Sequence, residues 1–472
     1  MINSISGIKA VQRIQLQQLK EWLSKKNRKP LIIRGARQVG KSTLVELFAK
    51  DQQQTLLNIN LERYPELAPV FATKDPQQVL QQIEFLPKAS KIGNDTLLFL
   101  DEIQAIPEAI PVLRYFYEDK PDLPVISAGS LLEFALTDHS FSMPVGRVQY
   151  LHMGPMTFSE FLAAQGEDKL YQLVTKYQLG QEIGELAHQR LLKLLRSYYF
   201  IGGMPEAVAV FADTQSYREV SEVHQSIIET YREDFPKYSG SRNLNRMVHV
   251  FNSVAHNIGT KVKYSNISSH DQSVTIKKDL DLLCMARVIS KVVHSHCSGI
   301  PLQADIEEKI YKLLFLDVGL MNSICGLNWQ VLSQYDDLKL INDGAIAEQF
   351  IGQHLQAQLN NSSNRELNYW LREGRSSNAE LDYVIALNGQ IIPIEVKAGA
   401  TGSLKSLHQF MGEKQSPVAV RFDASLPSIQ TINAKIQQKA GDKNIKYPLL
   451  SLPLYLVERL DNIVEEYLQS LH

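Results

Sequence analysis

Two glycines, a lysine and a hydroxyl residue stand at fixed spacing in the stretch GARQVGKS, residues 35–42. The spacing matches G-x-x-x-x-G-K-[ST], in which glycines let successive backbone N–H groups turn inward around a phosphate. An apolar run at 31–33 precedes the loop and predicts a buried strand, and helical periodicity follows it. This order is that of a nucleotide-phosphate loop. The candidate phosphate-binding residues are Gly35, Ala36, Arg37, Gln38, Val39, Gly40, Lys41, Ser42 and Thr43.

An acidic pair closes a second apolar run, TLLFLDEIQAI at residues 96–106. Asp101 stands at the end of this predicted strand, where a carboxylate can share a Mg²⁺ ion with the Ser42 hydroxyl and the phosphates. Glu102 is the candidate general base that orients and deprotonates the attacking water. Because the pair follows a phosphate loop, it indicates Mg²⁺-dependent hydrolysis of ATP.

Two further polar side chains are candidates for contacting the nucleotide. Ser130 ends a third predicted strand within residues 123–130. From there Ser130, or Ser127 earlier in the same strand, could sense the terminal phosphate, although a simple strand exit is an equal alternative for either residue. Arg147 lies in PVGRVQYLHMGP. It could reach the phosphates bound by a neighbouring copy, which would require a homo-oligomer, or it could simply be solvated.

The composition limits the class of partner. The 472 residues include 49 Lys and Arg and 51 Asp and Glu, a formal net charge of −2. Any contact with DNA or RNA must therefore come from local patches. The three cysteines form no C-x-x-C pair, which argues against a disulfide framework or a zinc ribbon. No apolar stretch approaches about 18 residues and no signal-peptide core is present, so we expect no membrane segment and a cytoplasmic location.

The chain changes character along its length. Strands and helices alternate over residues 1–160, which predicts an α/β ATPase core with a parallel sheet. Residues 161–240 show helical periodicity. Residues 241–330 combine short helices with a hairpin-like segment, a pattern typical of a winged helix, for which DNA and protein contacts both stay open. Residues 331–472 form the last predicted domain.

A β-hairpin is predicted in ELDYVIALNGQIIPIEVKAG, residues 380–399, because two strand-like arms flank an Asn-Gly pair. With that pair as a two-residue turn, Asp382 lies opposite Glu395 in a pair without backbone hydrogen bonds. Their Cβ atoms would be about 4.5–5.5 Å apart. Lys397 would lie on the same face of the hairpin.

Two carboxylates opposite each other repel, so a hairpin that serves only the fold has no need of them. A shared Mg²⁺ ion would relieve the repulsion, because hard cations bind carboxylate oxygens. Lys397 could then position water or stabilise charge on a phosphate, the D…E-x-K arrangement of a metal-dependent nuclease. Glu348, in the helix-like stretch 344–355, could be a further ligand. The alternative is an exposed hairpin with splayed carboxylates.

The chain resembles a family of prokaryotic AAA+ P-loop ATPases that join a winged-helix segment to a C-terminal, restriction-endonuclease-like PD-(D/E)XK domain. The resemblance covers nearly the full length. It rests on GARQVGKS, LLFLDEIQ, SAGSLLE, GRVQYLHMGPMTFSEFL, FIGGMPEAV, KIYKLLFLDVGL, GAIAEQF and ELDYV…IPIEVKAG. It implies ATP binding by residues 35–42 and hydrolysis served by Asp101 and Glu102. It also implies a nuclease-like motif of Glu348, Asp382, Glu395 and Lys397.

We therefore expect a Mg²⁺-dependent ATPase whose nucleotide state controls a nuclease-like domain acting on DNA or RNA. The alternative is an ATP-driven switch or DNA-binding regulator whose C-terminal domain recognises nucleic acid or a partner without cutting. A third hypothesis is a purely structural AAA+ scaffold, in which replacement of Glu395 would change nothing measurable.

Overall fold

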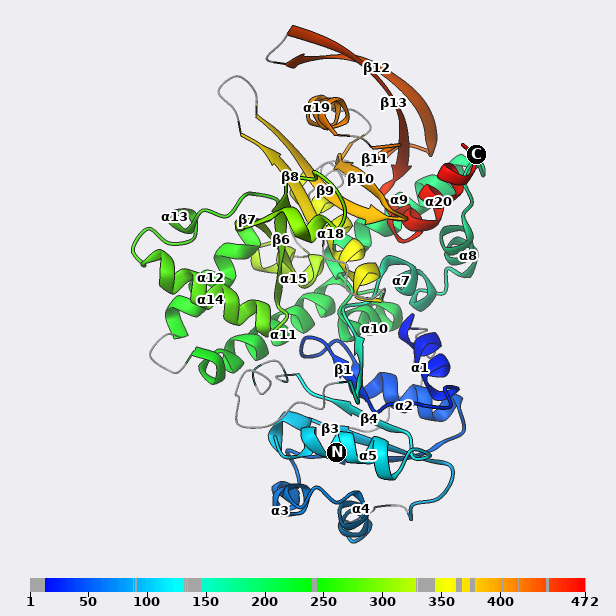
Figure 1. The fold of residues 1–472 in the computed structure, drawn as a ribbon, viewed down its shortest axis with the longest axis vertical. Helices are drawn as coiled ribbons and strands as arrows, with labels where there is room; N and C mark the ends of the chain where they lie inside the picture. Colours follow the sequence, from blue (N-terminus) through cyan, green and yellow to red (C-terminus); the bar gives the residue numbers. More distant parts are fainter. Residues whose placement is uncertain are drawn as a thin grey trace. The chain divides into compact units, whose positions relative to one another are not determined.

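The computed structural model describes residues 13–471 except 88, 90, 131, 133, 135–145, 240–243, 328, 330–343, 362–366, 374–377, 400–402, 415 and 439–440 (Figure 1). The chain divides into two compact units. Unit 1 comprises Met1–Pro155 and Met285–Val288, and unit 2 comprises Met156–Cys284 and Ile289–His472.

Unit 1 is built on a five-stranded parallel sheet, as the alternation of strands and helices predicts. Its strands, in spatial order, are β2 (Thr55–Asn60), β3 (Thr96–Asp101), β4 (Val125–Ala128), β1 (Leu31–Arg34) and β5 (Gln149–His152). The central strands are buried along nearly their whole length, which explains their continuous apolar runs. Because all strands are parallel, the carboxyl ends of β1, β3 and β4 meet at one edge.

The helices of unit 1 are α1 (Gln15–Leu23), α2 (Lys41–Asp51), α3 (Ala68–Ala72), α4 (Pro76–Glu84) and α5 (Ala109–Asp119). Short 3₁₀ turns, η1 (Pro65–Leu67) and η2 (Ile103–Ala105), also belong to the described part of the unit. One apolar cluster joins α3, α4 and α5 to the sheet. In α4, Val79 and Ile83 are spaced four residues apart, so both face this cluster. The cluster therefore holds these helices against the sheet whose strands β1, β3 and β4 end at one edge.

Unit 2 contains an eight-stranded mixed sheet. Its strands, in spatial order, are β12 (Ser428–Gln438), β13 (Gly441–Pro453), β11 (Ala419–Asp423), β10 (Gln390–Val396), β9 (Ala379–Leu387), β8 (Asn368–Arg372), β6 (Ile289–Ser295) and β7 (Ile306–Phe315). Helix α18 (Gly344–Asn361) packs against β7 and β10 (Figure 1). The sheet therefore gathers segments from both the middle and the end of the chain.

The other helices of unit 2 whose bounds the structure describes follow the helical periodicity of residues 161–240 and continue beyond it. They are α7 (Phe158–Ala164), α8 (Asp168–Lys176), α9 (Glu185–Ile201), α10 (Pro205–Thr214), α11 (Tyr217–Ser239), α12 (Leu244–His256), α13 (Tyr264–Ile267), α14 (Ser273–Met285), α15 (Val318–Ile324), α19 (Lys405–Glu413) and α20 (Leu460–Gln469), with 3₁₀ turns η4 (Leu302–Asp305) and η5 (Leu454–Arg459). Among the helices that the structure describes, none combines the length and apolar character needed to cross a bilayer.

The β6–β7 hairpin lies beside a strand, β8, that the sequence analysis assigned to another domain. Helices α12–α14 precede an antiparallel β6–β7 pair, in the order expected for residues 241–330. However, β6 also pairs in parallel with β8, through Val293 with Asn368 and His294 with Tyr369. Strands from residues 241–330 and from residues 331–472 therefore share one sheet. Periodicity marks a strand but does not identify the strand beside it, which explains the difference.

The β9–β10 hairpin has the register that the sequence predicts. Leu387 pairs with Gln390, and Tyr383 pairs with Ile394. The intervening Asn388 and Gly389 have φ values of 48° and 76°, as a two-residue turn of this type requires. The prediction of a tight Asn-Gly hairpin is confirmed.

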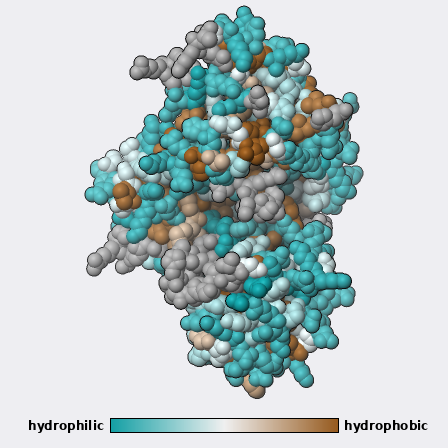
Figure 2. Space-filling view, viewed as in Figure 1, coloured by the Kyte–Doolittle hydropathy of each residue, from teal (hydrophilic) through white to brown (hydrophobic). Residues whose placement is uncertain are grey.

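The surface view shows hydrophilic residues over most of one face, with apolar residues in small separate groups (Figure 2). The most exposed large apolar side chains among the described residues include Phe85, Leu186 and Val274, which are 82%, 90% and 79% exposed. They belong to distant parts of the sequence. Single exposed apolar residues of this kind are ordinary and identify no partner.

Candidate functional site

The predicted phosphate loop connects β1 to α2. Gly40, which precedes the helix, has a left-handed φ of 88°, a conformation that glycine adopts without steric cost. At Gly35, a Cβ atom would stand 2.2 Å from the Met153 carbonyl oxygen. The first glycine therefore allows close packing beside the segment that follows β5, and the second allows the turn into α2.

Lys41 is the first residue of α2 and is only 8% exposed. Its Nζ donates to the carbonyl oxygens of Gly35, at 3.1 Å, and Ala36, at 2.8 Å. Burial lowers the pKa of Lys41 to about 8, although the charges of Glu102 and Asp101 oppose this shift. Neutral carbonyl groups hold the ammonium group over the loop. A bound phosphate would give it a negatively charged partner.

Ser42 and Asp101, the predicted Mg²⁺ ligands of the nucleotide site, lie in direct contact. The Ser42 hydroxyl donates to Asp101 Oδ2 at 2.8 Å. Burial raises the pKa of Asp101, and the bond from Ser42 opposes that increase. The contact exists because β3 and the start of α2 meet at the same sheet edge. A hydroxyl and a carboxylate side by side are suitable oxygen donors for Mg²⁺.

Glu102 follows Asp101 in a left-handed conformation with φ of 50°. Such a backbone is uncommon for a residue other than glycine, asparagine or aspartate. Its Oε2 accepts a hydrogen bond from Gln104 Nε2 at 2.6 Å and weaker ones from Ser130 N and Oγ, at 3.5 and 3.4 Å. The structure thus brings Ser130 beside Glu102. Sequence reasoning missed Gln104, for which a polar residue two positions beyond the acidic pair was the available signal.

The other predicted nucleotide residues occupy varied positions. Arg147 pairs with Glu118, with 3.2 Å between Nε and Oε1, and its guanidinium lies 5.7 Å from the Tyr117 ring centroid. Its side chain is 45% exposed. Within the loop and α2, Ala36 and Val39 are buried, Arg37 and Gln38 are partly buried, and Thr43 is exposed. A role for Arg147 toward another copy of the chain stays a prediction.

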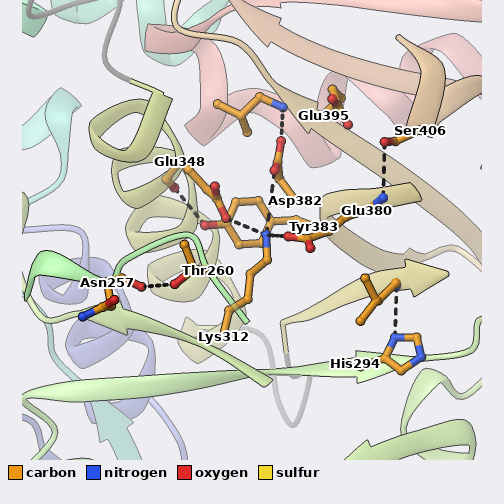
Figure 3. A network of polar contacts seen from close by, with 12 residues as sticks. Asn257, Thr260, His294, Lys312, Glu348, Glu380, Asp382, Tyr383, Glu395 and Ser406 are labelled. Carbon is orange, nitrogen blue, oxygen red and sulfur yellow. Dashed lines mark hydrogen bonds and ion pairs between the residues drawn. The ribbon is translucent and has the colours of Figure 1, made fainter. Parts of the chain in front are cut away.

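A second polar site lies in unit 2, where α18, β7, β9 and β10 approach one another (Figure 3). The structure brings together all four residues of the predicted nuclease-like motif. Two residues that sequence reasoning missed join them. We call this set the carboxylate–lysine cluster, and it consists of Lys312, Glu348, Glu380, Asp382, Glu395 and Lys397.

Lys312 lies at the centre of the cluster and is 2% exposed. Its Nζ is 2.9 Å from Glu348 Oε1, 2.5 Å from Glu380 Oε1 and 3.9 Å from Asp382 Oδ1 (Figure 3). Burial favours the neutral amine, but the surrounding carboxylates prevail and raise the pKa of Lys312 above its usual range. Lys312 is therefore charged. A lysine within the apolar run YKLLF was the signal for its role.

Glu395 and Lys397 form the other side of the cluster. Lys397 Nζ is 2.5 Å from Glu395 Oε1, whereas the buried Glu395 Oε2 finds no hydrogen-bond partner among the residues that the structure describes. Asp382 Oδ2 accepts a bond of 2.7 Å from the Val396 backbone N–H. Consequently, within the described part of the chain, one oxygen of Glu395 and one oxygen of Asp382 remain without a short hydrogen bond.

The cluster carries more negative than positive groups. Four carboxylates face two ammonium groups, so full ionisation leaves two negative charges unbalanced. Burial raises the pKa of Glu348 to about 8 and that of Glu395 to about 7, and it also raises the pKa of Asp382. Protons or a further cation must therefore offset the charge near neutral pH.

The cluster has the oxygen donors of a metal site, but the Lys312 ammonium group occupies the space between two of its carboxylates. Carboxylate oxygens suit hard divalent cations, and Glu395 Oε2 is available. Yet no three His, Cys, Asp or Glu side chains in the described part of the chain converge on a metal position. Lys312 Nζ lies between Glu348 and Glu380 instead. The sharing of one cation by Asp382 and Glu395 stays a prediction.

Three family models match successive parts of the chain. The AAA domain model matches residues 27–162, which include the phosphate loop and the acidic pair. Residues 27–162 are therefore similar to an AAA domain. A domain of unknown function, DUF8612, matches residues 192–331, and another, DUF4143, matches residues 343–449. The AAA match indicates ATP binding and hydrolysis, whereas the other two descriptions give no activity.

Comparison with solved structures gives distant similarities. The Aeropyrum pernix ORC2 protein in ADPNP–ADP complexes is 11% identical with a TM-score of 0.34, covering 70% of this chain and 97% of that one. The Thermotoga maritima RuvB Holliday junction branch migration motor is 13% identical with a TM-score of 0.29, covering 60% and 90%. A search of curated protein sequences finds no match.

Proposed function

We propose that the AAA domain binds ATP at the β1–α2 loop and hydrolyses it with the help of Mg²⁺. The observation that carries this proposal is the meeting of Lys41, Ser42 and Asp101 at one edge of the parallel sheet. Lys41 would exchange its loop carbonyls for phosphate oxygens. Ser42 and Asp101 would hold Mg²⁺, which would offset the charge of the phosphates. Glu102 would orient and deprotonate the attacking water.

Replacing Lys41 by alanine tests the binding step. Hydrogen bonds to charged groups contribute about 1.5–3 kcal/mol, so the affinity for ATP should fall about 10- to 150-fold in Lys41→Ala. Isothermal titration of the folded variant measures this loss. Lys50→Ala is the matched control, because Lys50 is an exposed lysine on the same helix. Equal affinities of Lys41→Ala and the parent would contradict the assignment of the loop.

The pH dependence of ATP binding provides a second test. The lowered pKa of Lys41, about 8, means that the free protein loses this charge as the pH rises through 8. Binding to a triphosphate needs the charged form, so the affinity should fall above pH 8 by up to about tenfold per pH unit. Titrations between pH 7 and 9.5 measure the slope. Lys41→Met should bind weakly without this slope; if it shows the parent's slope, another group is responsible.

We further propose a second function for unit 2, the hydrolysis of nucleic-acid phosphodiesters. Asp382 and Glu395 would hold a divalent metal ion, with Glu348 as a further ligand and Lys397 stabilising charge on the phosphate. The metal would supply charge neutralisation and a nucleophilic water. Support comes from the assembly of all these residues in one buried cluster and from the unpartnered Glu395 Oε2. A restriction-endonuclease-like fold and a winged helix at 241–330 belong to the same proposal.

The ATP state would control this second site, and a cytoplasmic homo-oligomer would form if Arg147 reaches a neighbouring copy. The decisive assay incubates the purified protein with Mg²⁺ or Mn²⁺ on single- and double-stranded DNA and RNA, with and without ATP. Metal-dependent cleavage supports the nuclease. Binding without cleavage favours the alternative, an ATP-driven switch or DNA-binding regulator. If the protein neither binds nor cleaves any of these nucleic acids while its ATP hydrolysis is intact, the proposal of a nucleic-acid role is wrong.

A further inference from the structure

Lys312 occupies a position where a lysine serves no purpose in packing. It lies within the part of β7, Tyr311–Phe315, that is buried at every residue. Lysine is almost never fully buried unless it is paired with an opposite charge. An apolar residue would fill this strand position without the cost of removing an ammonium group from water. The reason for Lys312 must therefore lie in the carboxylates that it contacts.

These carboxylates come from two other elements. Glu348 projects from α18, and Glu380 and Asp382 project from the same face of β9, toward the Lys312 ammonium (Figure 3). The ammonium also lies 5.2 Å from the Tyr369 ring centroid. Gly259 leaves room for the Glu348 carboxylate, because a Cβ there would stand 2.6 Å from Glu348 Oε2. The surrounding chain is thus shaped to seat this ion-pair arrangement.

We propose that Lys312 is the resident cation of the Glu348, Glu380 and Asp382 carboxylates, and that a divalent metal ion binds the cluster only in competition with the Lys312 ammonium. This inference rests on the second proposed function for the identity of the metal ligands, and it deepens that function by naming what controls metal access. Neither Lys312 nor Glu380 belongs to the D…E-x-K pattern.

The competition follows from distance and charge. Lys312 Nζ is 2.9 Å from Glu348 Oε1 and 2.5 Å from Glu380 Oε1, so it uses lone pairs that a metal ion would need. Mg²⁺ binds oxygen at about 2.0–2.1 Å, which would bring a metal bound to Glu348 close to the ammonium. Repulsion between the two cations in this buried place opposes simultaneous occupancy. The ammonium must move away for the metal to bind.

The test measures the affinity for Mn²⁺ directly. Lys312→Met removes the charge and keeps an unbranched side chain that is one heavy atom shorter. Full-length Lys312→Met and its parent, both with Asp101→Ala to remove the nucleotide-site ligand, are titrated with Mn²⁺ in the absence of nucleotide. We expect the dissociation constant for Mn²⁺ to be at least about tenfold lower in Lys312→Met than in the parent. Removing the ammonium group removes its repulsion of a metal ion bound to the same carboxylates, and this repulsion exceeds the ~1.4 kcal/mol that corresponds to a tenfold change. An unchanged or increased dissociation constant overturns the inference.

A control separates competition from general charge effects. Lys309 lies on the same strand but is exposed, so Lys309→Met should leave the Mn²⁺ affinity unchanged. If Lys309→Met gains as much as Lys312→Met, the effect is not local and the inference is wrong. Lys312→Gln, which retains a hydrogen-bond donor, provides a second uncharged variant and should show the same direction of change.

Thermal unfolding with and without Mn²⁺ covers the case of unstable variants. Mn²⁺ should raise the melting temperature of Lys312→Met and Lys312→Gln more than that of the parent. Variants that fold only when Mn²⁺ is present also support the inference, because the metal then replaces the lost charge. Variants that remain unfolded with Mn²⁺ overturn it, because a metal cannot take the place of the lysine.

The outcomes also separate this inference from the nuclease proposal. A gain in Mn²⁺ affinity without cleavage of any nucleic acid would support the role of Lys312 and contradict the nuclease. Metal-dependent cleavage by the parent, with no gain of affinity in Lys312→Met, would support the nuclease and contradict the competition.

Discussion

Glu102→Gln should slow ATP hydrolysis by about 10²–10⁴-fold, the usual contribution of a general base. The amide cannot accept the proton of the attacking water, but it has nearly the size and shape of the carboxylate. Gln104 and Ser130 donate to this side chain in the parent, so the amide oxygen can accept the same bonds. ATP binding should therefore stay near the parental value.

The measurements are phosphate release at saturating ATP and the calorimetric affinity for ATP. Glu108→Gln is the matched control, because Glu108 is an exposed glutamate in the same region and should leave both values unchanged. Hydrolysis by Glu102→Gln at the parental rate would show that another group activates the water. Loss of ATP binding instead of turnover would indicate that Glu102 shapes the nucleotide site.

Glu395→Gln should abolish metal-dependent cleavage of nucleic acid and leave ATP turnover near normal. Glu395 is 4% exposed, and its carboxylate contributes the unpartnered Oε2 to the cluster. Supporting residues around metal ligands are worth about 10–100-fold in affinity or activity, so loss of a ligand itself should exceed that range. ATP turnover should persist because the two sites belong to different units.

Cleavage and ATP turnover are measured on the same preparations, with Glu308→Gln as the control because Glu308 is an exposed glutamate on β7. Parental cleavage by Glu395→Gln would remove Glu395 from the proposed site. If the parent cleaves nothing but binds nucleic acid in a nucleotide-dependent way, the ATP-driven switch or regulator becomes the better description of unit 2.

Local interactions let the sequence determine the strand–loop–helix at the phosphate site and the hairpin in unit 2. The turn into α2 requires a left-handed backbone at Gly40, which directly precedes Lys41 in the same short segment. The Asn388-Gly389 turn fixes the register of β9 against β10 as far as the pair of Tyr383 with Ile394, the residues next to Asp382 and Glu395. Neighbouring residues suffice for such features, because turn geometry and the two-residue period of a strand act over a few positions.

The tertiary structure alone decided which distant segments meet. Lys312 on β7 and Glu348 on α18 reach Glu380 and Asp382 on β9 across long stretches of sequence, and β6 joins the C-terminal sheet through β8. Apolar periodicity shows which face of an element is buried, but it does not say which partner covers that face. The sequence therefore identified Glu348, Asp382 and Glu395 of the second site, while the fold decided that Glu380 and the buried Lys312 lie among them.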